Sequence, residues 1–379
     1  MIDRESINTK QAICILSLLI FGSSAIFGSV AGSAHDSWIA LLAAMVLAAP
    51  FFIVFSRIIK LFPGSDIFDI ALTVFGKIAG RIFILLYTLY STYLGALVLR
   101  NFTEFVQVAT KPETPQWAIL IILIAAIVYL VFNGVQVLGK WSAVIMPIYL
   151  IIVTATVILA YQQMDFSNLF PIASSDTGVM ADSAIKLFTF PFAETVLFLT
   201  ITKSLKKSQS PYKIYMIGLL IGGAVMLIVF FRNLFVLGGP TMESELFPSY
   251  TTIRIVRVGT FLQRLESTIS SNFYLGGITK IAVCLFGASI GTAKLLGIKG
   301  YKKALFPVAV IMAVFSQIVY KNVFEMLNGL SLYRWIALPF QTLLPIIIWI
   351  GAEIKTRKDK KNMKPKQSGN QEPQESGAY

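Results

Sequence analysis

The sequence has few charged residues, one histidine and two cysteines. Charged residues occupy 13% of the 379 positions, against roughly 25% in soluble globular proteins. With 56% hydrophobic residues, this composition excludes an ordinary soluble domain and indicates a membrane protein. His35 has no cluster of cysteines or carboxylates around it, so we expect no catalytic metal, no cofactor and no enzyme activity. Cys14 and Cys284 lie in apolar runs, which argues against a disulfide framework.

Ten runs of about 20 mostly apolar residues, the length that crosses a bilayer, predict an all-α membrane protein. The runs lie near residues 11–33, 37–59, 82–103, 116–134, 142–161, 184–202, 214–238, 261–293, 304–321 and 333–354. We expect them to form one transmembrane, permease-like domain of residues 1–355. The tail, 356–379, is first basic and then polar, and its low content of apolar residues predicts disorder.

Lysine and arginine accumulate on the cytoplasmic side of short membrane loops. If both termini are cytoplasmic, 22 of the 32 basic residues lie on the inner side, eight on the outer side, and two, Arg232 and Lys280, inside apolar runs. This asymmetry predicts an even number of spans with both termini inside. The net charge of +13 is concentrated at the inner edges and in the segment KTRKDKKNMKPK, where anionic lipids explain it and no nucleic acid is needed.

Two of the runs are interrupted near their middle. The first reads QAICILSLLIFGSSAIFGSVAG, and the sixth contains FTFPFAETVLF, in which Pro191 removes a backbone donor. Each interruption alone is also typical of close helix packing or of a tolerated proline kink. Together they stand first in each group of five runs, 11–161 and 184–354, as in transporters built from two inverted repeats.

Unpaired backbone groups at such breaks can bind a ligand near the middle of the membrane. N–H groups suit a carboxylate and carbonyl groups suit an ammonium, so a zwitterionic amino acid would match both. The predicted ligand-binding residues are Gly22, Ser23, Ser24, Ala25, Phe190, Pro191, Phe192, Ala193 and Glu194.

Charged side chains inside apolar runs are costly and are candidates for function. Glu194 either contacts a ligand amine or stabilises the break, or it pairs with a buried cation. Lys280 either takes the place of a coupling cation or pairs with Glu194 or another acid. Arg232 either reaches toward the membrane surface or is paired inside the protein. Lys280 also lies on a helical stripe of small residues that is typical of close packing, formed by Gly276, Cys284, Gly287 and Gly291.

The elements FGSSAIFG in the first run, FPFAE in the sixth, and RLE followed by GGITK in the eighth resemble the spore germination permeases, the B subunits of bacterial germinant receptors. That family is similar to the amino acid, polyamine and organocation transporters, which have a five-plus-five inverted repeat with broken helices 1 and 6. The resemblance covers about residues 8 to 355, and Ala193 stands where the family often has glycine. It implies a spore inner membrane protein with a small nutrient ligand and with receptor A and C subunits as partners.

Two functions remain open from the sequence. One is a receptor subunit that binds a nutrient and signals to its partners, and the other is a secondary transporter that moves an amino acid with protons or another cation. A receptor binds without sustained uptake, whereas a transporter accumulates its substrate. The outer stretch 247–267, which alternates apolar and basic residues, is expected to cover the site, to form an interfacial helix or to dock a partner subunit.

Overall fold

The computed structural model describes residues 6–26, 35–110, 113–256 and 266–363. This part of the chain is nearly all helical, and its only extended pairing is an isolated bridge between Ile7 and Leu205. The α-helices are α1 (Thr9–Phe21), α2 (Ser37–Leu61), α3 (Ile67–Phe105), α4 (Gln116–Phe132), α5 (Val135–Ala160), α6 (Thr177–Leu187), α7 (Pro211–Leu237), α8 (Gly239–Ser244), α9 (Pro248–Ile255), α10 (Glu266–Leu295), α11 (Lys302–Ile318), α12 (Val323–Leu338) and α13 (Leu344–Met363). The π-helical and 3₁₀ segments are η1 (Val106–Thr110), η2 (Tyr161–Gln163), η3 (Phe166–Leu169), η4 (Phe188–Phe192), η5 (Ala193–Thr200), η6 (Thr202–Ser204) and η7 (Pro339–Leu343).

Seven helical segments of the described chain are long and apolar enough to cross a membrane. They are Ser37–Leu61, Ile67–Ala109, Val135–Gln163, Thr177–Thr200, Pro211–Leu237, Ser270–Leu295 and Leu332–Asp359. Two shorter apolar helices, α1 and α4, coincide with the first and fourth predicted runs, and α11 coincides with the ninth. The predicted multi-pass helical membrane protein is therefore confirmed, whereas ten complete crossings in two inverted repeats stay a prediction.

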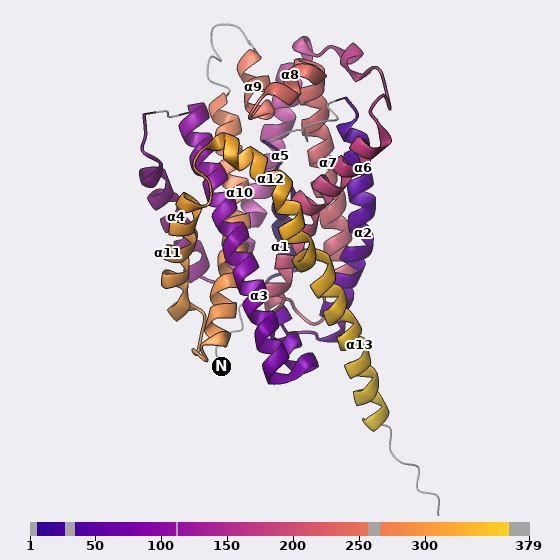
Figure 1. The fold of residues 1–379 in the computed structure, drawn as a ribbon, viewed down its shortest axis with the longest axis vertical. Helices are drawn as coiled ribbons and strands as arrows, with labels where there is room; N and C mark the ends of the chain where they lie inside the picture. Colours follow the sequence, from indigo (N-terminus) through magenta and orange to yellow (C-terminus); the bar gives the residue numbers. More distant parts are fainter. Residues whose placement is uncertain (1–5, 27–34, 111–112, 257–265, 364–379) are drawn as a thin grey trace, which may run out of the picture.

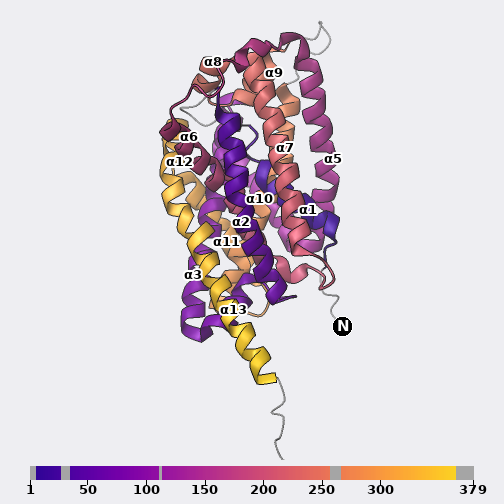
Figure 2. The same cartoon turned by 90° about the vertical axis from the view of Figure 1, so that its right-hand side faces the viewer.

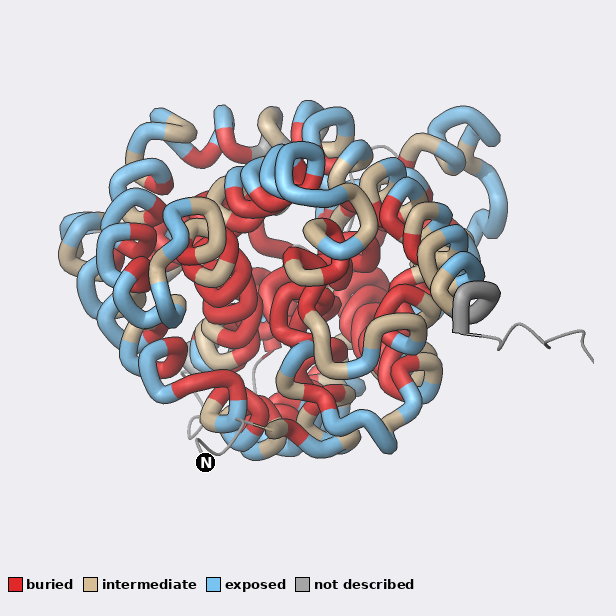
Figure 3. Tube along the Cα trace, turned by 90° about the horizontal axis from the view of Figure 1, so that it is seen from below, coloured by how far each residue is buried: buried red, intermediate tan, exposed pale blue. Residues whose placement is uncertain are grey.

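The helices form an elongated bundle (Figures 1 and 2). The beginning of α1 and the end of α13 lie at one end, called here the tail end, and α8 and α9 lie at the opposite end, called the α9 end. Figure 3 shows buried residues gathered in the middle of the bundle and exposed residues around its rim. Large apolar side chains occur on that rim: Val46, Ile122 and Phe306 are 72%, 71% and 69% exposed. Such an apolar exterior requires lipid around it.

Small residues let the central helices approach closely. α1 packs against α5, α7 and α10, and α3 packs along α10. On α7, Gly218 and Gly222 face α1, and a methyl group at Gly218 would lie 3.1 Å from the Leu16 Cγ atom. The bundle is therefore tight around α1, the helix that carries the first predicted break.

Three segments differ from the sequence-based expectation. The third run, predicted near 82–103, is preceded by further helix, because α3 begins at Ile67 and bends at Gly76, where φ is 75°. Glycine allows this left-handed conformation at no steric cost. The sixth span begins at Thr177, before the predicted start at 184. In the tail, residues 356–363 were expected to be disordered but continue α13, with a Thr356 hydroxyl that donates to the Ala352 carbonyl at 2.8 Å.

Candidate ligand-binding site

The sixth helix is broken at Phe190. α6 ends at Leu187 and continues as the π-helical η4 and the 3₁₀ segment η5. Phe190 has φ −134° and ψ 107°, an extended conformation, because proline disfavours the helical conformation in the residue before it. The carbonyl of Thr189, beside the break, accepts a hydrogen bond from the Gln341 amide at 2.9 Å. The break predicted from Pro191 is present, and a side chain from a distant segment satisfies one of its backbone groups.

Glu194 lies just after this break and forms an ion pair with Lys280 of α10. Both side chains are completely buried. The Lys280 ammonium also lies 4.7 Å from the centroid of the Phe190 ring, where the ring face attracts a cation. Of the alternatives that the sequence left open for these two residues, the structure shows the mutual pairing.

Tyrosine and glutamine side chains complete this charge pair. The Tyr333 hydroxyl donates to Glu194 Oε1 at 2.7 Å, and the Tyr333 and Tyr90 hydroxyl oxygens lie 3.1 Å apart. The Gln341 amide donates to the Tyr90 hydroxyl at 2.8 Å. Both carboxylate oxygens of Glu194 thus face a donor or a cation, as a buried charge requires. The paired-charge site, as we call it, consists of Tyr90, Phe190, Glu194, Lys280, Tyr333 and Gln341.

A small cavity adjoins the paired-charge site. Its volume is about 10 Å³, and Asn101, Phe190, Glu194 and Tyr333 contribute to its walls. This space is about what a single water molecule needs. The helices are therefore closed around Glu194 in this conformation, and a nutrient would enter only if they separated.

The first helix ends at Phe21 and residues 22–26 form turns, so the interruption predicted in the first run, 11–33, is present. Residues 27–33 of that prediction lie outside the described residues. A methyl group at Gly22 would lie 2.6 Å from the carbonyl oxygen of Gly276, so the end of α1 touches the backbone of α10. The hydroxyls of Ser23 and Ser24 are buried and have no hydrogen-bond partner within the described part of the chain. Those two hydroxyls are available to a ligand.

Arg232 is fully buried on α7, at 2% exposure, so it does not reach toward the membrane surface. Its guanidinium donates to the Thr156 hydroxyl at 2.8 Å and to the Asn233 side-chain oxygen at 3.1 and 2.7 Å. Among the residues that the structure describes, no carboxylate lies within ion-pair distance of it. Of the two alternatives for Arg232, the structure therefore shows partners inside the protein, and these are the neutral side chains of Thr156 and Asn233.

A second cavity, of about 20 Å³, lies beside this guanidinium. We call it the arginine cavity, and its walls include Ala25, Tyr149, Arg232, Ser249 and Asn272. The predicted site residues therefore fall into two places. Phe190 and Glu194 meet Lys280 at the sixth-helix break, whereas Ala25 meets Arg232 at the first-helix break. α1 packs against η4 and η5, which connects the two.

The stripe of small residues on α10 packs closely against neighbouring helices, as predicted: Gly276 faces the end of α1, and Gly287 and Gly291 face α3. A methyl group at Gly287 would lie 2.8 Å from the Ser91 hydroxyl oxygen, and the Cys284 Cβ atom would lie 3.1 Å from a methyl group at Gly95. Lys280 lies on this crowded face. Its ammonium is held in place by the packing of α10 as well as by Glu194.

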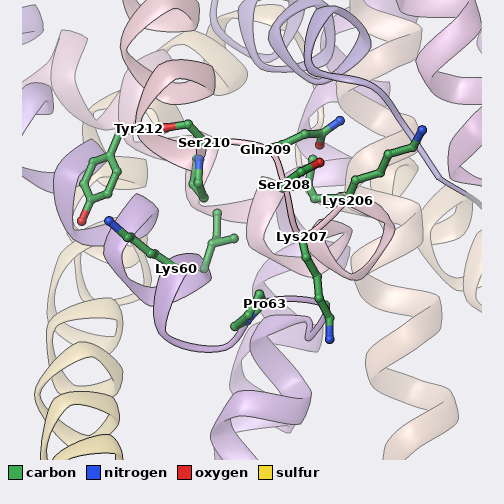
Figure 4. Close-up of a pocket in the computed structure, with 12 residues that line it drawn as sticks. Lys60, Pro63, Lys206, Lys207, Ser208, Gln209, Ser210 and Tyr212 are labelled. Carbon is green, nitrogen blue, oxygen red and sulfur yellow. The ribbon is translucent and has the colours of Figure 1, made fainter.

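A larger cavity, of about 290 Å³, opens at the tail end between the end of α2 and the beginning of α7 (Figure 4). Lys60, Lys206 and Lys207 line it, but their ammonium groups point away from one another. It contains none of the predicted ligand-binding residues. This larger cavity is therefore separate from the predicted ligand-binding site and does not support it.

Sequence reasoning missed several residues of these two sites. Tyr333 and Gln341 were not selected, although Gln341 follows Pro339 in an apolar run and so combines the two signals that singled out the sixth helix. Asn233 directly follows Arg232, and that adjacency was a usable signal. Nothing local marks Ser249, whose hydroxyl donates to the Ala25 carbonyl at 2.5 Å. In the predicted covering stretch 247–267, residues 257–265, and with them Arg264 and Leu265 of the RLE element, lie outside the described residues.

Comparison with solved structures shows the fold. The chain is similar to MhsT in complex with L-phenylalanine, with a TM-score of 0.62 and 12% identity over 94% of this chain and 98% of that one. It is also similar to Mhp1, a nucleobase-cation-symport-1 family transporter in a closed conformation with bromovinylhydantoin bound, with a TM-score of 0.61 and 15% identity over 90% and 78% of the two chains. The chain therefore has the same fold as these two proteins.

Comparison with known sequences shows the family. Spore germination protein KB of Bacillus subtilis (strain 168) is 27% identical over 367 residues, 95% of this chain and 98% of its own length. The putative spore germination protein YfkT of the same organism is 22% identical over 317 residues, 83% of this chain and 87% of its own. Residues 6–324 match the spore permease family model, described as spore germination protein. The chain therefore belongs to the spore germination protein family of membrane permeases.

Proposed function

We propose that this chain is the membrane subunit of a spore germinant receptor. It binds a small nutrient, an amino acid, at the two helix breaks and passes a conformational change to receptor A and C subunits. It lies in the spore inner membrane with both termini cytoplasmic, and its basic tail end faces anionic lipids. The observation that carries the proposal is the break of the sixth helix at Phe190 beside the buried Glu194–Lys280 pair.

The ligand site in this proposal spans both breaks. It comprises Gly22, Ser23, Ser24, Ala25, Phe190, Pro191, Phe192, Ala193 and Glu194, with Lys280 and Arg232 as its charged neighbours. Support comes from the buried, unpartnered hydroxyls of Ser23 and Ser24 in the described chain. It also comes from the paired positions of the breaks, each at the beginning of one half, 11–161 or 184–354, as inverted repeats require.

In this proposal, the receptor signals by shifting between a closed and an open conformation of the helices around the two breaks. A ligand shifts such an equilibrium only by its difference in affinity for the two states. The cavity of about 10 Å³ at Glu194 is too small for a nutrient, so binding favours a state in which η4 and α1 separate. Partner subunits that contact the moving helices then receive the change.

The second candidate function is a cation-coupled transporter of amino acids. The observation that favours it is the fold, which resembles transporters including MhsT, whose solved structure contains L-phenylalanine. The two functions differ in flux, because only the transporter accumulates the nutrient against a gradient.

The test uses spores that carry Glu194→Gln, exposed to single amino acids and sugars, with membrane abundance measured by immunoblot. We expect loss of the response to one nutrient at normal abundance. Because Glu194→Gln leaves Lys280 unpaired, the Glu194→Gln/Lys280→Gln double variant is the matched control for folding. An abundant double variant that responds normally to every nutrient would remove Glu194 from the sensing path.

Uptake into proteoliposomes separates the receptor from the transporter. The purified chain is reconstituted, and uptake of the nutrient that triggers germination is measured with and without a proton gradient. Binding without accumulation supports the receptor. Accumulation driven by the gradient, lost in the Glu194→Gln/Lys280→Gln variant, would replace it with the transporter.

A further inference from the structure

Arg232 is a buried cation for which the described chain supplies no anion. Its side chain is 2% exposed, and its partners are the neutral side chains of Thr156 and Asn233. Burying a charge without a counter-charge is expensive, and proteins normally pair it or bind an ion to it.

The Arg232 guanidinium has more N–H donors than hydrogen bonds in the described chain. Arginine carries five N–H groups, and three hydrogen bonds are made here, by the Nε and two terminal nitrogens. The Thr156 hydroxyl accepts from Arg232 and itself donates to the Val153 carbonyl at 2.8 Å. Two N–H groups of the guanidinium therefore remain for another acceptor.

The arginine cavity provides the space for that acceptor. Its volume of about 20 Å³ exceeds the ~10–15 Å³ that one water molecule needs. Asn272, which is 3% exposed, lines the same cavity, and its side-chain oxygen has no partner among the described residues. A buried polar side chain without a partner is uncommon and points to an occupant. The Asn272 oxygen can accept a hydrogen bond from a bridging water molecule or from an ammonium group that belongs to the same ligand as the anion.

We propose that the arginine cavity is a binding site for a small monovalent anionic group, which completes the guanidinium of Arg232. The group is either a free inorganic anion such as chloride or the carboxylate of the nutrient, and the carboxylate, being larger, requires the cavity to widen. A planar guanidinium can donate two parallel hydrogen bonds to a carboxylate, which favours the nutrient carboxylate over an inorganic anion. The carboxylate source rests on the proposed function, whereas the anion site itself does not.

A chain of hydrogen bonds connects the arginine cavity to the first helix break. Asn233 accepts from Arg232 through its oxygen and donates through its amide nitrogen to the Ser249 hydroxyl at 2.9 Å. Ser249 in turn donates to the Ala25 carbonyl at 2.5 Å, and its backbone N–H donates to the Ile26 carbonyl at 3.3 Å. An anion that reorients the guanidinium therefore acts on the turn that ends α1.

The test measures the thermal stability of the full-length chain in detergent, in sodium gluconate, whose anion is too large for the cavity. Sodium acetate or sodium chloride replaces gluconate at constant ionic strength. We expect a saturable rise in Tm on the order of 2 °C or more, because a ligand of the folded state stabilises it. A larger effect of acetate supports the carboxylate source, and a larger effect of chloride supports the inorganic source.

Two variants test whether Arg232 carries the effect. Arg232→Gln removes the charge and should abolish the rise. Val153→Leu adds a methylene to the cavity wall but keeps the guanidinium, so it should weaken the rise even if Arg232→Gln does not fold. Lys207→Gln, at the tail end, is the control and should keep it. No rise with either anion, or an equal rise in Arg232→Gln, would overturn the site.

The anion-dependent rise in Tm can be tested separately from the proposed function. The Glu194→Gln/Lys280→Gln variant should keep the anion-dependent rise, since its changes lie in the paired-charge site. A normal germination response in that variant would count against the proposed function and leave the anion site intact. Loss of its response together with an absent rise in the unmodified chain would count against the anion site alone.

Discussion

The paired-charge site and the arginine cavity both bury a basic side chain inside the bundle, and they differ in the groups that face that side chain. Lys280 has the carboxylate of Glu194, itself bound by the Tyr333 hydroxyl at 2.7 Å. Arg232 has only neutral partners in the described chain. The first site is electrically complete and holds the sixth-helix break together. The second is complete only with a further anion.

A third buried cation shows which of the two is the exception. Arg100 lies 2.6 Å from Glu104, and Gln116 bridges them by accepting from Arg100 at 3.0 Å and donating to Glu104 at 3.0 Å. Removing one member of such a pair leaves an uncompensated charge. Lys280 and Arg100 each have a carboxylate partner. Arg232 differs from both because its partners in the described chain are neutral.

The largest effect is expected from Lys280→Met, which leaves Glu194 buried without a counter-charge. We expect a loss of about 3–5 kcal/mol in the free energy of unfolding, measured by denaturation in detergent micelles. Restoring neutrality in Glu194→Gln/Lys280→Met should recover much of it. Lys203→Met is the matched control, because the Lys203–Asp69 pair is exposed and worth at most about 1 kcal/mol. Equal stability of the Lys280→Met and Lys203→Met variants would contradict the structural role of the pair.

A smaller effect is expected from Gly276→Ala, which tests the contact between the breaks and α10. The added methyl would lie 2.8 Å from the Gly22 carbonyl oxygen, so the two backbones must separate. We expect a loss of about 1–3 kcal/mol, the usual range for overpacking, and a lower Tm. Gly178→Ala, in the exposed first turn of α6, is the control. Unchanged stability of Gly276→Ala would show that this contact is loose.

The next effect concerns Asp36, a buried charge held by hydrogen bonds instead of by a cation. Its carboxylate accepts from the N–H groups of Ala173 at 2.7 Å and Ser175 at 2.9 Å. Burial acts to raise the pKa of Asp36, but these hydrogen bonds outweigh it and hold the pKa below the ordinary value. We expect Asp36→Asn to lower stability at pH 7 by about 1–2 kcal/mol.

The pH dependence of this effect has a defined sign. A carboxyl with a lowered pKa stabilises the fold above its unfolded pKa, about 3.9, and the stabilisation is lost as the pH falls through the folded value. The difference in Tm between the unmodified chain and Asp36→Asn should therefore shrink as the pH drops below about 4. A constant difference across that range would contradict it.

The smallest effect on stability, and the sharpest test of the comparison, is expected from Arg232→Met. Removing an uncompensated buried charge also removes its desolvation cost, which offsets the loss of the hydrogen bonds to Thr156 and Asn233. We expect a change within about 1 kcal/mol, measured as for Lys280→Met and in gluconate. A loss as large as that of Lys280→Met would show that Arg232 has a structural counter-charge after all.

The candidate site was predictable only in part. Pro191 marks the sixth-helix break because proline acts on its own peptide unit and on the residue before it, and Phe190 is extended as that local effect requires. Glu194 and Lys280 were recognisable as charges in apolar runs, but the sequence left their roles open. Tyr333 and Gln341 were missed because they reach the site from α12 and η7, which lie far from Glu194 in the sequence.

The sequence by itself determined the class of this protein, most of its spans, and the two helix breaks. Hydropathy, proline geometry and small-residue clusters are local properties, so they can be read along the chain. Only the tertiary structure decided which charges meet: it brought Glu194 to Lys280 across two helices and left Arg232 with Asn233 and Thr156. The physical reason is that a Coulomb interaction depends on distance and burial in space, and separation along the sequence fixes neither.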